Sequence, residues 1–171
     1  ITTRLVGSEM CIRDRWREIL KTKAGVIKLA DNAKIKLILK QTADGSTDSS
    51  ELFTRGEFRE HGGSFFIDYD ESEATGYAGS HVQLRIGQQD DTVTMTRTGK
   101  AFSSLVFENG KRHFCQYGTE YGDCMIGIST VDMRNGMTSD GGELYVRYTI
   151  DVNAGLMLEN EITIHVKPHN N

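Results

Sequence analysis

The sequence predicts an all-β fold, an antiparallel up-and-down β-barrel of about 8–10 strands. Apolar and polar residues alternate along most of the chain, which is typical of strands with one buried face. Short glycine-containing turns separate these segments, and the 171 residues include 18 glycines but one proline. Consecutive hairpins of this kind close into a barrel and so remove their exposed edges. A two-sheet sandwich is the main alternative, although no long crossover is needed here.

The first 32 residues stand apart from this pattern. Residues 5–14 read LVGSEMCIRD, which resembles the translation of the end of a transposase adapter used to prepare sequencing libraries. We therefore expect residues 1–15 to be an artefactual leader that contributes no packing, with a natural leader peptide as the alternative. Residues 16–32 are assigned as an uncertain leader, and residues 33–168 as a single barrel domain.

The first strand is expected from residue 33. There the apolar residues Ile35, Leu37 and Leu39 alternate with polar residues, mostly lysines. The polar segment 43–50 (ADGSTDSS) predicts a loop by its composition. A second strand is expected around residues 51–60 and is followed by an HGG turn at residues 61–63. The third strand carries four residues on one face, Phe65, Ile67, Tyr69 and Glu71.

In the middle of the chain, a strand is expected at residues 81–86 and a turn at residues 87–91. On the next strand Arg97 shares its face with Val93 and Met95. Asn109-Gly110 is a strong hairpin signal. It precedes the dense segment HFCQYGTEYG at 113–122. The last strands are expected around 124–128, 144–150 and 158–166, with turns at 140–142 and 153–155.

Composition excludes several functional classes. The formal net charge is −4 and no basic cluster occurs, which argues against nucleic-acid binding. No apolar run approaches the length that spans a membrane, so we expect no membrane partner. Outside the leader the chain has two cysteines, Cys115 and Cys124, and no secretory apolar region is visible. These features predict a reducing, cytoplasmic location.

Five segments carry a family resemblance: YDESEATG (69–76), TMTRTG (94–99), LVFENGKRHFCQYGTEYG (105–122), GGELYVRYTIDV (141–152) and NEITIHVK (160–167). In this order and spacing they resemble the YwiB family of small bacterial proteins, from about residue 33 to residue 167. The resemblance implies a calycin-like β-barrel, the architecture of lipocalins and fatty-acid-binding proteins. It implies no biochemical function, cofactor or catalytic residue.

Alternation places several polar side chains on the inward faces with the apolar ones. The candidate ligand-binding residues are Tyr69, Glu71, Arg97, His113, Tyr117 and Tyr121. A buried charge is costly unless it is paired and hydrogen-bonded. We therefore expect Arg97 to pair with Glu71, and His113 and Tyr117 to complete a polar network. The same pattern also suits a structural plug that closes one end of the barrel.

Three functions follow from these candidates. The first is a binding module for a small, partly apolar ligand, with Arg97 as a carboxylate anchor. The second is an enzyme that uses His113, Tyr117 or Glu71 in proton transfer. The third is a filled barrel that acts through its surface, as an interaction module or a homodimer. Whether large side chains fill the interior distinguishes the third from the others.

No motif supports a metal or another cofactor. His113 and Cys115 share a strand face, but a zinc site needs further ligands and no C-x-x-C or H-E-x-x-H pattern occurs. No serine lies in a nucleophile elbow. The sequence therefore predicts no cofactor, and a non-enzymatic function is favoured.

Overall fold

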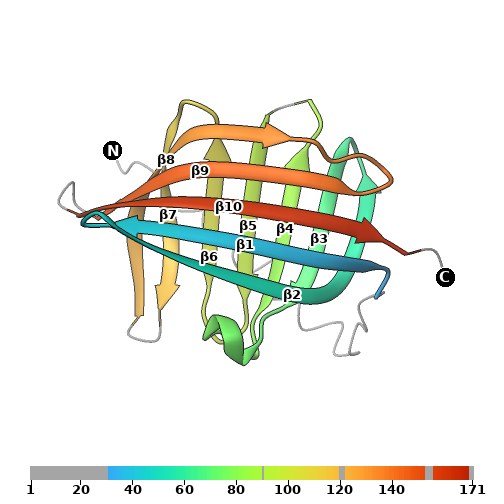
Figure 1. Cartoon of the computed structure of the whole chain (residues 1–171), viewed down its shortest axis with the longest axis horizontal. Coiled ribbons are helices and arrows are strands. Elements are labelled where there is room, and N and C mark those ends of the chain that lie inside the picture. The colour runs from blue at the N-terminus through green and yellow to red at the C-terminus, as the bar shows by residue number, and fades with distance from the viewer. Residues whose placement is uncertain (1–30, 90, 120–121, 153–155, 170–171) are drawn as a thin grey trace, which may run out of the picture.

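The computed structural model describes residues 31–89, 91–119, 122–152 and 156–169, which form a closed antiparallel barrel (Figure 1). Its strands are β1 (Ala33–Ala43), β2 (Ser46–His61), β3 (Ser64–Asp70), β4 (His81–Gly87), β5 (Thr92–Thr98), β6 (Ser103–Glu108), β7 (Arg112–Thr119), β8 (Gly122–Asn135), β9 (Gly142–Val152) and β10 (Leu156–Pro168). A short 3-10 helix, η1 (Glu73–Thr75), lies between β3 and β4. Each strand pairs with its neighbour in sequence, as an up-and-down barrel requires.

The barrel closes through the pairing of its first and last strands. β1 runs antiparallel to β10, in a register that extends from Ala33 opposite Pro168 to Thr42 opposite Glu159. The predicted return of the final strand to the first is confirmed, and the sandwich alternative is wrong. No helix in the described part of the chain is long and apolar enough to cross a membrane.

The polar segment after β1 is a hairpin, not the loop that its composition predicts. Asp44 and Gly45 have φ angles of 49° and 79°, the positive values that a two-residue type I′ turn requires. Residues 46–50 then continue as strand β2, with Ser46 opposite Ala43. The prediction failed because Ser, Thr and Asp are common in loops and also on a strand with both faces in water.

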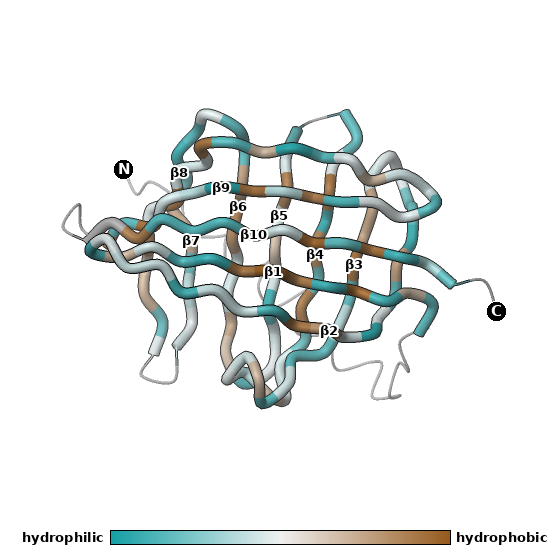
Figure 2. The backbone as a smooth tube through the Cα atoms, in the orientation of Figure 1, coloured by the Kyte–Doolittle hydropathy of each residue, from teal (hydrophilic) through white to brown (hydrophobic). Residues whose placement is uncertain are grey.

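Alternating apolar residues fill the barrel interior. Figure 2 shows them concentrated along the middle of the strands, with polar residues toward the turns. The most completely buried large side chains come from five different strands: Ile35, Ile67, Ile86, Ile128 and Leu144. The core is therefore one continuous cluster shared by the whole barrel.

Strand β2 changes partner at Gly56. It pairs with β1 from Ser46 to Gly56 and with β3 from Gly56 to His61. A Cβ atom at Gly56 would lie 2.1 Å from the Asp68 carbonyl oxygen and 2.9 Å from Cδ1 of Ile35, so the corner needs a glycine. Residues 46–55 of β2 pair with β1 along one edge. Along their opposite edge they pair with no strand in the described part of the chain.

Candidate functional site

The barrel encloses a cavity of about 340 Å³. Most side chains that line it are apolar and project from the strands on all sides, among them Leu37, Leu84, Leu105, Val146 and Ile164. Four of its lining residues, Leu39, Ser50, Glu51 and Ala74, are exposed to solvent. The mouth of the cavity therefore lies between the hairpin of β1 and β2 and the η1 segment, beside the edge of β2 that lacks a second strand.

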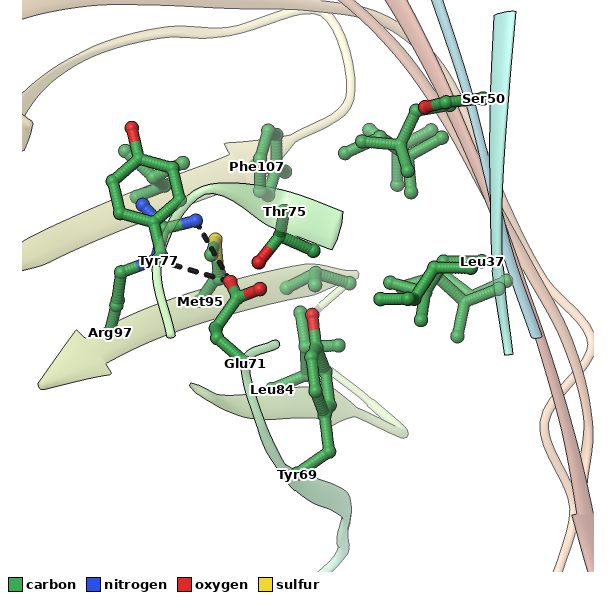
Figure 3. Close-up of a pocket in the computed structure, with 18 of the residues that line it drawn as sticks. Leu37, Ser50, Tyr69, Glu71, Thr75, Tyr77, Leu84, Met95, Arg97 and Phe107 are labelled. Carbon is green, nitrogen blue, oxygen red and sulfur yellow. Dashed lines mark hydrogen bonds and ion pairs between the residues drawn. The ribbon is translucent and has the colours of Figure 1, made fainter. Parts of the chain in front are cut away.

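A buried ion pair forms the polar part of the wall (Figure 3). Arg97 projects from β5, and Glu71 follows the end of β3. Nε and Nη2 of Arg97 both donate to Oε1 of Glu71, at 3.3 and 3.1 Å. The two side chains are 8% and 3% exposed. The predicted pairing of Arg97 with Glu71 is confirmed, whereas its role in ligand binding stays a prediction.

The segment from Glu71 to Ser80, which we call the cap, covers this pair. The ring of Tyr77 stacks on the Arg97 guanidinium, with 3.8 Å from its carbon to the ring centroid. The Tyr77 hydroxyl lies 3.1 Å from the hydroxyl of Tyr117, on β7. The Glu71 amide donates to the Ser80 carbonyl at 2.9 Å, which joins the two ends of the cap. The cap thus fixes Tyr77 over the buried charges.

Several polar atoms of the cavity wall have no hydrogen-bond partner among the described residues. Oε2 of Glu71 and Nη1 of Arg97 are both buried in this state. The hydroxyls of Tyr69 and Tyr148 also make no hydrogen bond to the part of the chain that the structure describes. In Figure 3 the Tyr69 hydroxyl points into the cavity, and the second oxygen of Glu71 points away from Arg97. Buried polar groups are normally satisfied, so the Tyr69 and Tyr148 hydroxyls are available to a molecule in the cavity, whereas Oε2 of Glu71 and Nη1 of Arg97 are unsatisfied but have almost no accessible surface.

The environment keeps the cavity tyrosines neutral. Burial raises the pKa of Tyr69 and of Tyr148 well above the ordinary value of a phenol, and the Arg97 charge only partly opposes this. Burial and the hydrogen bond with Tyr117 raise the pKa of Tyr77 to about 12. At neutral pH these hydroxyls are therefore hydrogen-bonding groups without charge.

We expect alkaline pH to destabilise the barrel through Tyr69 and Tyr148. Their pKa values are raised in the folded state, so the stability that they contribute is complete below about pH 10, the pKa of an unfolded tyrosine. It falls as the pH rises further, because the unfolded state then releases protons that the folded state retains. Phenolate absorbance and circular dichroism, recorded together, should show the last tyrosines ionising with unfolding. Ionisation of all six tyrosines near pH 10 in an intact fold would contradict this.

His113 does not join the polar network that the sequence predicts. Its Nε2 lies 3.1 Å from Oε2 of Glu108, beside the turn between β6 and β7, and it does not line the cavity. Lys111 and, to a smaller extent, His113 lower the pKa of Glu108. His113 and Tyr117 do lie on one strand, but they are four positions apart, or about 13 Å along the strand. The alternation of apolar and polar residues predicted the strand face of His113 correctly, but it could not predict how far along the strand His113 lies from the cavity.

Most of the other candidate residues lie together. Tyr69, Glu71, Arg97 and Tyr117 line one cavity, while Tyr121 lies outside the described residues. Cys115 is buried and accepts a hydrogen bond from the Val106 amide at 3.4 Å, and burial raises the pKa of its thiol. The described residues contain no cluster of three metal-ligating side chains.

Two residues of the site, Tyr77 and Tyr148, are not among the candidates that the sequence predicts. Tyr148 shares its face of β9 with Leu144 and Val146, so the alternation that placed Arg97 inside could also have placed Tyr148 there. Tyr77 lies in the irregular cap, where no periodicity indicates the direction of a side chain. Only the fold brings it onto Arg97.

The closed, all-β antiparallel barrel has the architecture of a calycin-like barrel protein. A family model matches residues 35–164, and the chain belongs to that family, the domain of unknown function DUF1934. Among solved structures it is similar to the crystal structure of the ywiB protein from Bacillus subtilis, with a TM-score of 0.68 and 17% identity over 83% of this chain and 96% of that one. The predicted resemblance to the YwiB family is thereby confirmed. A search of the curated proteins returned no match to the chain.

Proposed function

We propose that this protein binds a small, partly apolar molecule inside its barrel. The observation that carries the proposal is the cavity of about 340 Å³, within the range of about 300–1,000 Å³ that is typical of ligand sites. Its wall is mostly apolar, and a few polar groups gather beside the cap, which is the usual composition of such a site. Buried atoms of Glu71 and Arg97 that lack partners support the same function.

The alternatives receive less support. The cavity of about 340 Å³ favours a binding site over a filled barrel that acts through its surface. An enzyme that uses the cavity for acid–base chemistry has less support, because His113 pairs with Glu108 and does not line the cavity. A cytoplasmic location, the absence of nucleic-acid and membrane partners, and a homodimer stay predictions from the sequence.

Binding of N-phenyl-1-naphthylamine, an uncharged dye that fluoresces in apolar surroundings, tests the proposal. We expect the dye to bind at one site per chain. Leu39→Trp, which places a large ring at the exposed wall of the mouth, should weaken binding by about tenfold or more, equivalent to about 1.4 kcal/mol.

Ile38→Trp is the matched control, because Ile38 is the preceding residue of β1 and does not line the cavity. This variant should bind the dye like the unaltered protein. Equal affinity in all three proteins would show that the dye binds the outer surface, and the proposal would then be wrong.

A further inference from the structure

The charges that face the cavity already balance one another. Glu51 lies at the mouth and pairs with Lys36 at 3.2 Å. The other charged side chains among the described lining residues are Glu71 and Arg97, which neutralise each other. A ligand with a charged head would therefore bring an uncompensated charge into a buried site, which is strongly unfavourable.

Each kind of charged head also meets a specific obstacle. A carboxylate that approaches Arg97 also approaches the free Oε2 of Glu71, which repels it. An ammonium group that approaches Glu71 meets the guanidinium of Arg97 in the same way. The anchor role that the sequence suggests for Arg97 would require the ligand to displace Glu71.

An uncharged head with a donor and an acceptor suits the polar groups at this end of the cavity. The neutral hydroxyls of Tyr69 and Tyr148 line it and can donate or accept a hydrogen bond. Oε2 of Glu71 and Nη1 of Arg97, which are buried without partners, can accept and donate one after a small movement of their side chains. A primary amide carries both functions within one small planar group. The apolar wall, with Leu37, Leu105 and Val146, suits an aliphatic chain.

We propose that the ligand is an uncharged amphiphile, such as an aliphatic amide, with its polar head beside Glu71 and Arg97 and its apolar tail within the barrel. This inference rests on the proposed function, because it requires an interior binding site. It adds the chemical class of the ligand and predicts discrimination between heads that carry the same tail.

Calorimetric titration of the protein with octanamide, octanoate and octylamine tests the inference. At about pH 7 the three probes are neutral, anionic and cationic on the same tail. We expect octanamide to bind about tenfold or more tightly than either of the others, and Leu39→Trp to weaken its binding. If octanoate or octylamine binds equally well or better, and Leu39→Trp still weakens that binding, the interior site stands and the inference is wrong. If none of the three binds, the proposed function fails as well.

Glu71→Gln provides an independent test, because it removes the negative charge and leaves that of Arg97. The preference should shift by about tenfold or more toward octanoate, whose carboxylate then meets an uncompensated guanidinium. Glu73→Gln is the matched control, since Glu73 is exposed on the same cap, and it should leave the ranking unchanged. An unaltered ranking in a folded Glu71→Gln protein would overturn the inference. If Glu71→Gln does not fold, the inference is tested by the order of the three probe affinities in the unaltered protein alone.

Discussion

Replacement of Arg97 by Met should lower the free energy of unfolding by about 3–5 kcal/mol, the cost of leaving one member of a buried ion pair alone. Glu71 would keep a side chain that is 3% exposed, and its carboxylate would lose both hydrogen bonds from the guanidinium. The stacking of Arg97 on Tyr77 would be lost as well. Urea denaturation of the two proteins measures the difference.

The double variant Arg97→Met/Glu71→Met separates charge from packing. Because it removes both charges, it should recover most of the lost stability, as buried ion pairs often do when both members become apolar. Arg112→Met is the matched control, because Arg112 makes a bidentate pair with Asp151 on the exposed surface, and it should cost much less. A double variant no more stable than Arg97→Met would show that the loss did not come from the stranded carboxylate.

Substitution of Gly56 by Ala should destabilise the barrel by about 3 kcal/mol, at the upper end for an overpacked core. The new Cβ atom would lie 2.1 Å from a backbone oxygen, that of Asp68, so β2 and β3 must separate. Gly56 pairs with both Ala33 and Tyr69, and the separation would disturb the strand that leads to the ion pair. Thermal or urea unfolding detects the change.

Gly136→Ala controls for the general effect of adding a methyl group to a glycine. A Cβ atom there would meet only the Glu143 carbonyl oxygen, at 3.2 Å, which requires a small shift. We expect a much smaller loss than at Gly56. Similar losses in the two variants would mean that the corner of β2 is not specially constrained.

The fold was largely predictable because each strand has its own local signal. Alternation marked the strands, and turns such as Asn109-Gly110 marked their connections, with Lys111 N–H donating to the Glu108 carbonyl as a hairpin requires. The requirement to close the sheet then dictated the pairing of β1 with β10. The prediction of a loop at residues 43–50 was wrong because polar composition does not distinguish a loop from an exposed hairpin, whereas Asp44-Gly45 is itself a hairpin signal.

The site was only partly predictable, because alternation determines the face of a residue and not its neighbours across the barrel. It placed Glu71 and Arg97 inside, and the rule that buried charges pair then joined them. It could not separate Tyr117, at the capped end, from His113, near the opposite turn. Nor could it reveal Tyr77, whose position depends on the irregular path of the cap.

The unpaired edge of β2 also affects the tendency of the protein to aggregate in concentrated solution. A strand edge with free backbone groups is a template for the strands of another molecule, and this is a common route to aggregation. The edge at residues 46–51 reads STDSSE, and these side chains are exposed. Asp48 places a negative charge on this edge, which disfavours its pairing with a second copy of itself, and Ser and Asp have little preference for extended strands. The unpaired edge of β2 thus carries side chains of the kind that disfavour the addition of a strand from another molecule.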